Sequence, residues 1–589
     1  MSAQKTHFLC PAPSLGAFPN LVSDLLSAKA VSLLLLVISI LSVNLSAAAS
    51  PDEIRLPKSR VRVDIVPGAP ARSYAPTHGP SAKFIIFNEG SKKRSVKVSI
   101  DGSIRAERTV LVGAGERRQI FIAAPSNLSA THKFEAIVLE TGEKEHTGSS
   151  YGSSDAYSLG RLGPLDFALN AEKPWNDFGS LESVVTDDWR SLSGYRAIVV
   201  PRSVLSETWK YRQVVLDWIV QGGVLLVAEE SVERTGAPPT PIFPRAPLAE
   251  PLDEPLEGAF SRRIGLGLVA FIPVDEFALM DENFEERNKL LLDLSWAIAP
   301  GSLENDLKYQ LKKMFGPDFV HVHWQLFVLL LLFSVLVGPV GWRVLVRKKR
   351  RPFVYLLLVM SCSALFSLSI FLADIFAQGI NLKGSSQSVT FLDQRVDREL
   401  SLNEAAVWAP TSLNTSLTMR SDTATLIANS DSRNKISSAT QTVRGESQFI
   451  ENALSVREQT LVATRRIGEA LGRLSVTQTN AELRIENHLG RGLHDVRLWY
   501  SGKLYQIPSL TKGETAVLRP TLSGSFPHAP SLQGLLVPKA SHLLGQLAAG
   551  KLGTDRFIAR ADNGLLTLQL SNQNFQTLRE STHIIGGLL

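Results

Sequence analysis

Two apolar runs separated by a short basic segment constrain this chain more than any other feature. The first run extends from Trp324 to Trp342, and the second extends from Phe353 to Phe376. Each is long enough, at a helical rise of about 1.5 Å per residue, to cross a hydrocarbon layer about 30 Å thick. We therefore predict two transmembrane helices, over residues 324–342 and 353–377.

The segment between these runs, residues 343–352, predicts which way the chain faces. Short loops rich in lysine and arginine remain in the cytoplasm, so the regions before and after the two helices are expected on the opposite side. The same charges are compatible with binding to anionic membrane lipid. The residues that determine this topology are Arg343, Arg347, Lys348, Lys349, Arg350 and Arg351.

The N-terminal segment, residues 1–49, supports the same orientation. It contains an apolar run from Ala30 to Val43, preceded by Lys29 and followed by small residues. This pattern is typical of a secretory signal peptide, and an uncleaved signal anchor is the alternative. The sequence thus predicts a multi-pass protein of a bacterial cytoplasmic (inner) membrane, with both large domains on the extracytoplasmic, periplasmic side.

Composition excludes several classes of function. The formal net charge is +6 over 589 residues, and much of it lies in residues 343–352. No folded domain is left with the basic face that nucleic-acid binding requires. Of the two cysteines, Cys10 lies near the N-terminus and Cys362 within an apolar run. We therefore predict no structural disulfide, no thiolate metal site and no cofactor.

Short alternating strands predict β domains at both ends of the chain. Residues 55–150 have the strand and turn spacing of an immunoglobulin-like (Ig-like) β-sandwich. Residues 378–589 predict a second, mainly β domain. A strand, an Asn-containing turn, a strand, a Gly-Glu pair and another strand occur in both regions. The polar stretch from Thr411 to Ser447 predicts a long loop or solvated strands.

Residues 160–300 have a different pattern. The apolar runs 195–201 and 224–228 predict strands buried on both faces. Between them, residues 206–220 predict a helix with Ser206 as N-cap, ended by Gly222 and Gly223. Such a β-α-β unit implies parallel pairing. Residues 301–323 predict a juxtamembrane helix. The expected fold class is multidomain α/β plus all-β with a two-helix membrane hairpin.

The stretches LSGYRAIVVPRSVLS, VVLDWIVQGGVLLVAEE and RIGLGLVAFIPVD resemble the core of class I glutamine amidotransferase-like domains. More narrowly, together with LFVLLLLFSVLVGPVGWRVLVRKKRR, they resemble versions fused to membrane segments in uncharacterised bacterial envelope proteins. The resemblance covers about residues 160–377 and implies an α/β fold for this region. The family's chemistry requires a cysteine nucleophile and a histidine. This region has no cysteine outside the second apolar run and no histidine before His321.

Four charged residues remain as candidates for ligand binding. Arg202 follows the first buried strand, and Glu229 with Glu230 follows the second. The carboxyl ends of parallel strands are where α/β folds bind ligands. Asp187, which precedes the first strand, completes the set. Solvated charges at strand ends are the simpler interpretation, and we predict no catalytic and no metal-ligating residues.

These observations favour a non-catalytic role. We expect a membrane-anchored envelope protein that acts as a scaffold, or as a ligand- or partner-binding component, through its extracytoplasmic domains. The expected partners are membrane lipid and other envelope proteins, with no nucleic acid. The alternative is an enzyme with an unrecognised carboxylate-based site in the α/β crevice.

Overall fold

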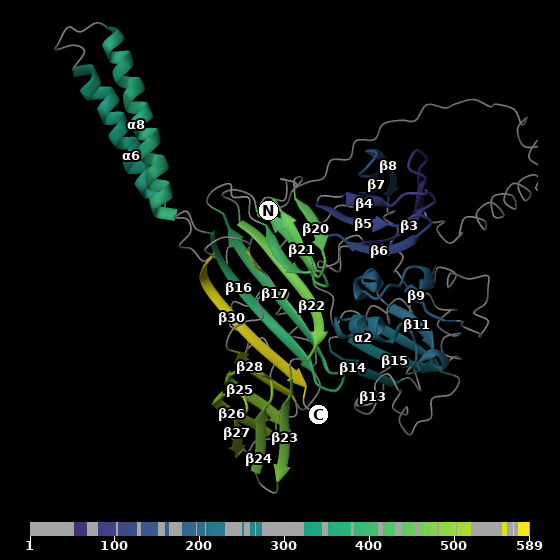
Figure 1. The fold of residues 1–589 in the computed structure, drawn as a ribbon. Coiled ribbons are helices and arrows are strands. Elements are labelled where there is room, and N and C mark those ends of the chain that lie inside the picture. Colours follow the sequence, from purple (N-terminus) through teal and green to yellow (C-terminus); the bar gives the residue numbers. More distant parts are fainter. Residues whose placement is uncertain are drawn as a thin grey trace, which may run out of the picture. The chain divides into compact units, whose positions relative to one another are not determined.

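We describe the chain from a computed structural model (Figure 1). The predicted signal segment 1–49, the juxtamembrane segment 301–322 and most of the basic loop lie outside the described residues. The structure describes residues 52–67, 81–101, 104–125, 131–150, 159–163, 179–195, 197–206, 208–229, 250–251, 260–265, 267–273, 323–343, 352–378, 382–409, 416–429, 439–454, 459–470, 472–479, 482–501, 503–519, 556–561, 569–570 and 575–587.

Residues 52–150 form two antiparallel sheets that share one core, and we call them the N-terminal β domain. The first sheet has the order β1-β2-β3-β6, and the second contains β5-β4-β7-β8. Alternating apolar residues such as Val63, Phe84 and Phe134 point inward and are fully buried. The strands are β1 (Asp52–Leu56), β2 (Val61–Pro67), β3 (Ser81–Asn88), β4 (Arg94–Asp101), β5 (Arg105–Val112), β6 (Arg117–Ala123), β7 (Thr131–Val138) and β8 (Glu143–Ser150).

A buried carboxylate lies in the second of these sheets. Glu135 on β7 is 4% exposed and pairs with Arg105 and with Lys144, whose Nζ lies 2.5 Å from Oε1. Burial by itself would raise the pKa of Glu135, but the hydrogen bonds and charges of Lys144 and Arg105 outweigh it and lower this pKa. The ion pairs therefore stabilise the ionised carboxylate in the folded chain.

Glu135→Gln is expected to change how stability depends on pH. A carboxylate whose pKa is lowered by folding stabilises the chain above its ordinary pKa of 4.5, and this contribution is lost as the pH falls. The wild type should therefore exceed the variant in free energy of unfolding at neutral pH, and the difference should shrink below pH 4.5. Urea unfolding at a series of pH values measures it. A difference that stays constant across the series would contradict this account.

The region predicted to be α/β contains a seven-stranded mixed sheet, which with its helix we call the α/β unit. Strands β10, β9, β11, β12 and β15 are parallel neighbours in that order, whereas β14 and β13 continue the sheet antiparallel. The strands are β9 (Leu159–Arg161), β10 (Gly179–Ser180), β11 (Ala197–Pro201), β12 (Val224–Glu229), β13 (Glu250–Pro251), β14 (Phe260–Ile264) and β15 (Gly267–Pro273).

Helix α2 (Arg212–Val220) connects β11 to β12, so the predicted β-α-β unit and its parallel pairing are confirmed. The helix begins later than predicted: Tyr211, not Ser206, occupies the N-cap position, and residues 208–211 form turns. The two glycines at its end have separate roles. Gly222 has φ 126°, and a Cβ at Gly223 would lie 2.4 Å from the Trp218 ring.

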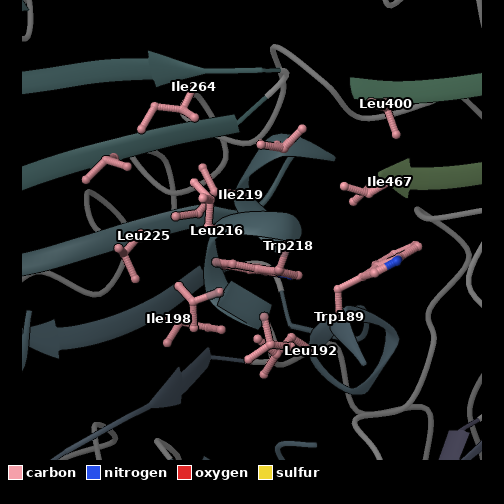
Figure 2. Packing of buried hydrophobic residues seen from close by; sticks show 14 of the residues in the cluster. Trp189, Leu192, Ile198, Leu216, Trp218, Ile219, Leu225, Ile264, Leu400 and Ile467 are labelled. Carbon is pink, nitrogen blue, oxygen red and sulfur yellow. The ribbon is translucent and has the colours of Figure 1, made fainter. Parts of the chain in front are cut away.

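The core of the α/β unit extends beyond the unit itself. Figure 2 shows Trp218 and Ile219 of α2 among Ile198 and Leu225 of the sheet. The same buried cluster includes Leu400 and Ile467, which belong to strands far along the chain. The helix therefore packs between its own sheet and a second one, and both faces of α2 are covered by apolar side chains.

That second sheet belongs to the central β unit, residues 382–469. Its strands β19, β22, β17 and β16 are neighbours in this order, while β18, β21 and β20 form a hairpin layer in another sheet. Bounds are β16 (Leu382–Asp393), β17 (Arg398–Trp408), β18 (Leu417–Arg420), β19 (Ala424–Asn429), β20 (Thr440–Arg444), β21 (Ser447–Glu451) and β22 (Gln459–Glu469). The stretch read as a loop or solvated strands, residues 411–447, thus contains paired strands.

The last part of the chain forms the C-terminal β domain. A three-stranded sheet, β23-β24-β27, shares a core with strands β26, β25 and β28, and β30 pairs with β28. The strands are β23 (Leu474–Thr479), β24 (Glu482–Asn487), β25 (Leu493–Tyr500), β26 (Lys503–Leu510), β27 (Thr515–Leu518), β28 (Arg556–Ala561), β29 (Gln569–Leu570) and β30 (Phe575–Gly587), of which β29 pairs with β18.

Strand pairing joins both β domains to the central β unit. Strand β20 pairs with β5 of the N-terminal β domain, and β16 pairs with β30 of the C-terminal β domain. Both pairings are parallel. Figure 1 shows β30, in yellow, beside β16. The sheets are therefore continuous across regions that are distant in sequence.

Two helices account for the apolar runs. Helix α6 covers His323–Val335 and continues as a π-helical turn, Leu336–Val340, and α8 covers Pro352–Gln378. The Phe333 and Phe366 rings lie 5.1 Å apart, so the helices contact each other. Regular α-helix stops in the first run near Pro339, which has no N–H to donate. The α6 segment has 13 residues.

The predicted membrane topology and fold class are contradicted by the structure. Within the part of the chain that is described, no helix combines the length and the apolar character that a membrane span requires. This finding is against the transmembrane helices at 324–342 and 353–377, and against a multi-pass inner-membrane protein with periplasmic domains. The described residues are mostly in strands and include three α-helices, so a multidomain α/β fold with a membrane hairpin is wrong as a description.

Candidate functional site

The structure brings two of the predicted ligand-binding residues to one edge of the parallel sheet. Pro201 on β11 pairs with Ala228 on β12, and Arg202 and Glu229 follow these two residues directly. Arg202 begins a short 3-10 helix, η4 (Arg202–Val204). This edge is the carboxyl end of the parallel strands. The side chain of Glu229 and the whole of Glu230 lie outside the described residues.

Asp187 belongs to another part of the α/β unit. It lies exposed in a turn before η3 (Trp189–Leu192), which leads into the N-terminal end of β11. Arg202 follows the C-terminal end of the same strand. The structure therefore places Asp187 before one end of β11 and the other candidates after the opposite end.

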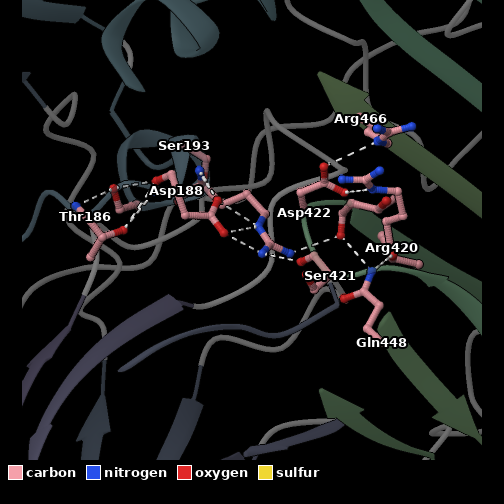
Figure 3. A network of polar contacts seen from close by, with 12 residues as sticks. Thr186, Asp188, Ser193, Arg420, Ser421, Asp422, Gln448 and Arg466 are labelled. Atoms are coloured by element: carbon pink, nitrogen blue, oxygen red, sulfur yellow. Dashed lines mark hydrogen bonds and ion pairs between the residues drawn. The ribbon is translucent and has the colours of Figure 1, made fainter. Parts of the chain in front are cut away.

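A buried arginine next to Asp187 makes the contacts that the sequence did not predict. Arg190 on η3 is 8% exposed, and its guanidinium donates to the Asp188 carboxylate, with Nη2 2.5 Å from Oδ2. Its Nη1 also donates to the Thr423 carbonyl at 3.0 Å, and its Nη2 to the Ser421 carbonyl at 2.6 Å. Figure 3 shows this network between η3 and the loop before β19.

Local hydrogen bonds hold Arg190 in place. The Asp188 side chain accepts from the Arg190 backbone N–H at 2.9 Å and so caps η3. Burial alone would lower the pKa of Arg190, but the adjacent Asp188 carboxylate and Asp422 reverse this and raise it. In the same loop, Asp422 pairs with Arg420 at 3.5 Å and with Arg466 on β22 at 3.4 Å. The guanidinium thus remains charged and is fully used in these contacts.

Three further polar contacts connect the α/β unit to the central β unit. Arg398 on β17 pairs with Asp217 on α2, with Nε 2.9 Å from Oδ1. Burial raises the pKa of Asp217, although Arg398 acts against this. The Asp393 carboxylate accepts the Gly265 N–H at 2.8 Å. These two contacts, and the third described next, join residues that are more than a hundred positions apart in the sequence. The contacts of Arg190 with Ser421 and Thr423 do the same.

Arg465 on β22 makes the third contact. Its Nη1 lies 3.3 Å from the Gln221 side-chain oxygen and 3.4 Å from the Gln221 carbonyl at the end of α2. Burial lowers the pKa of Arg465 to about 10. Its Nε is buried without a hydrogen-bond partner among the described residues. A charge held in such surroundings is costly unless its neighbours stay in place, so this contact also depends on a fixed arrangement.

These interface residues gave no signal in the sequence. Arg190 follows Asp187, Asp188 and a tryptophan, and a short charged turn of this kind is usual for the surface. Asp188 in the N-cap position before η3 could have been recognised as a cap. The partner carbonyls of Ser421 and Thr423 are backbone groups more than 230 positions away, which no local motif encodes.

The described residues provide no metal site. Among them, no group of three or more His, Cys, Asp or Glu side chains is arranged to hold a metal ion. What the arrangement provides instead is a set of fixed contacts: the buried Arg190 with its Asp188 partner, the Arg398–Asp217 ion pair between the units, and hydrogen bonds from arginines to backbone carbonyls. The chemistry of this interface is that of attachment between two folded units.

Comparison with known proteins gives one family match. Residues 470–586 match a family model described as a domain of unknown function (DUF8725). No curated protein matches the chain. Solved structures that are similar include the yeast delta-COP-I mu-homology domain complexed with a Dsl1 WxWxV peptide, 8% identical, which covers 35% of this chain and 96% of its own, with a TM-score of 0.19.

The same yeast domain without the peptide is 8% identical, covers 36% of this chain and 98% of its own, and has a TM-score of 0.20. A Paenibacillus cycloisomaltooligosaccharide glucanotransferase complexed with cycloisomaltoheptaose is 14% identical over 28% of this chain and 27% of its own, with a TM-score of 0.15. Scores this low carry no argument about function. The family match begins directly after β22 and extends into β30, so it describes the C-terminal β domain.

Proposed function

We propose that this chain is a non-catalytic protein that acts as a scaffold, or as a ligand- or partner-binding component. In this proposal the α/β unit is a structural connector between β domains. The observation that carries it is the contact of buried Arg190 with the Ser421 and Thr423 carbonyls. A charged group used in this way holds two units in a fixed arrangement and is not free to act on a substrate.

The carboxylates at this interface are also held by fixed contacts. Asp188, Asp217 and Asp393 each have an arginine partner within 3 Å. Catalytic carboxylates are recognised by pKa values that are shifted toward the pH at which they exchange protons, usually in a crevice. Burial raises the pKa of Asp217, but its carboxylate is held by both Arg398 and Gln213. These groups therefore support attachment rather than proton transfer.

The sequence supports the proposal independently. The amidotransferase resemblance would require a cysteine after β11, where this chain has Arg202 and Ser203. Without that nucleophile and without a histidine in residues 147–320, the acyl-transfer mechanism of such domains cannot operate.

A variant with alanine at Arg202, Glu229, Glu230 and Asp187 tests the proposal. We expect it to restore the phenotype of a strain that lacks the gene to the same extent as the wild-type gene does, since no reaction depends on these residues. Immunoblotting must show wild-type accumulation of the variant. Arg190→Met, assayed in parallel, is expected to restore the phenotype poorly. A quadruple variant that accumulates normally but fails to complement would instead favour the carboxylate enzyme.

A further inference from the structure

The N-terminal and C-terminal β domains each contain a buried asparagine, and the two asparagines bond to backbone groups at equivalent positions of their domains. Asn88 ends β3, is 1% exposed, and its Nδ2 donates to the carbonyls of Lys92, Val112 and Gly113 at 2.8, 3.1 and 2.8 Å. The backbone carbonyl of Asn88 accepts the Gly115 N–H at 2.8 Å. This network fixes the β3–β4 turn against the end of β5.

Asn487, at the end of β24 and fully buried, repeats this pattern. Its Nδ2 donates to the carbonyls of Arg491, Leu510 and Thr511 at 2.8, 3.0 and 3.1 Å, and its carbonyl accepts the Gly513 N–H at 2.8 Å. Strand pairings agree as well: β3 pairs with β6 and β4 with β5, while β24 pairs with β27 and β25 with β26. The two domains therefore share one fold, in which β26 corresponds to β5.

The corresponding strands differ in what covers their outer edges. In the N-terminal β domain, β20 adds to β5 in parallel, with Thr440, Gln441 and Thr442 opposite Arg105, Ala106 and Glu107. The Arg105 N–H donates to the Ala439 carbonyl at 3.1 Å. In the C-terminal β domain, β26 is the last strand of its sheet among the described residues. Among the described residues, the edge that β20 covers in one domain therefore has no added strand in the other, and we call it the open edge.

The register shows which backbone groups this edge presents. Tyr500 pairs with Lys503 across a two-residue loop, a closing pair that exchanges hydrogen bonds. By alternation, the N–H and C=O groups of Leu504 and Gln506 face away from β25. Pro508 occupies the next outward position, where a missing N–H disturbs no pairing within the sheet. The open edge is therefore the first half of β26.

The side chains around this edge favour an uncharged, extended occupant. Lys503 is the only charged residue in β26, so the edge has little of the charge that usually discourages strand addition. Leu504 lies opposite Trp499 and packs, partly buried, against an apolar cluster. The Trp499 indole nitrogen is buried without a hydrogen-bond partner among the described residues. An added strand would extend the Trp499–Leu504 row and could bring an acceptor to it.

We propose that the Leu504–Gln506 edge of β26 binds an extended, threonine- or glutamine-rich segment of a partner protein by parallel strand addition, as β20 does at β5. This rests on the proposed binding function and identifies the class of partner. Main-chain hydrogen bonds supply the affinity in this mode of recognition, and side chains on alternate positions supply specificity.

The probe is a synthetic peptide with the sequence of residues 438–446, which includes β20. Hydrogen exchange of the full chain reports binding through the Leu504 amide. At a peptide concentration about ten times the dissociation constant, exchange should slow roughly tenfold. Gln506→Pro, which removes an outward N–H, should abolish the slowing, whereas the matched control Gln506→Ala should keep it.

A second measurement needs no altered protein. The same peptide methylated on the Gln441 nitrogen cannot donate to the edge and should not slow exchange in the wild type. No effect of the unmodified peptide, or equal effects in Gln506→Pro and Gln506→Ala, would overturn the proposal. Protection of Leu504 that rises with chain concentration alone would overturn the choice of partner in favour of a second copy. None of these results changes the alanine test of the proposed function, because its four residues lie outside β26.

Discussion

Replacing Arg190 with methionine is expected to lower the free energy of unfolding by about 3–5 kcal/mol, the usual effect of removing one partner from a buried ion pair. Methionine fills similar space but leaves the Asp188 carboxylate without its cation. It also removes the Arg190 donors from the Ser421 and Thr423 carbonyls, of which Thr423 keeps the bond from Gln448. Urea unfolding followed by tryptophan fluorescence measures the loss, since Trp189 is adjacent.

Two comparisons separate this effect from a general loss of charge. Arg118→Met removes an exposed arginine that pairs only at the surface, and it should change stability by no more than about 0.5 kcal/mol. The double variant Asp188→Asn with Arg190→Met removes the unpaired carboxylate and should recover part of the loss. A single Arg190→Met variant as stable as Arg118→Met would show that the network contributes nothing.

The paired asparagines give the second large effect. Asn88→Ala and Asn487→Ala are each expected to destabilise their own β domain by about 2–4 kcal/mol, because three buried or partly buried backbone carbonyls lose a donor in each case. Hydrogen exchange resolved by segment measures the opening free energy of each domain separately. The two losses should be similar in size.

Aspartate variants provide the matched control. Asn88→Asp and Asn487→Asp retain the size and the acceptor oxygen but place a carboxylate oxygen against carbonyl oxygens, so they should be no more stable than the alanine variants. If Asn88→Ala weakened its domain and Asn487→Ala did not, the shared fold of the two domains would lose its energetic support, and the correspondence of β26 with β5 would weaken with it.

The parts of the fold that the sequence predicted are those with strong local patterns. Strands β11 and β12 are short continuous apolar runs, and the Gly222-Gly223 pair marks the end of α2. The start of that helix was misplaced because Ser206 is a good capping residue in a segment that forms turns instead. Apolar length alone also suggested membrane spans at α6 and α8, which the structure does not support.

Strands made of polar residues were the part of the fold that the sequence predicted least well. The region 411–447 contains few large apolar residues, so the sequence predicts either a long loop or solvated strands there, and the structure forms strands β18 to β20. Gln441 and Gln448 are buried and bonded to each other, with Nε2 of the first 2.6 Å from Oε1 of the second. Gln448 also donates to the Thr423 carbonyl at 2.8 Å. Side chains that satisfy one another across strands give no periodic signal of burial.

The candidate site was predicted only in part for a related reason. Arg202 and Glu229 do come to one sheet edge, as strands in parallel register require. The interface through Arg190 and Arg465 depends instead on which backbone carbonyls and amides of a distant segment lie opposite, and that is set by the tertiary arrangement. The recurring Asn and Gly-Glu pattern, in contrast, was visible in the sequence and corresponds to the shared asparagine network.

The central claim is that the α/β unit is fixed to the central β unit through Arg190, and hydrogen exchange in the wild type and Arg190→Met tests it most directly. The two segments to follow are 186–193, which carries η3, and 419–426, which contains the carbonyl partners. The account predicts that exchange accelerates in both segments together in the variant, while β3 to β6 of the N-terminal β domain remain unchanged. Acceleration confined to residues 186–193 would contradict it.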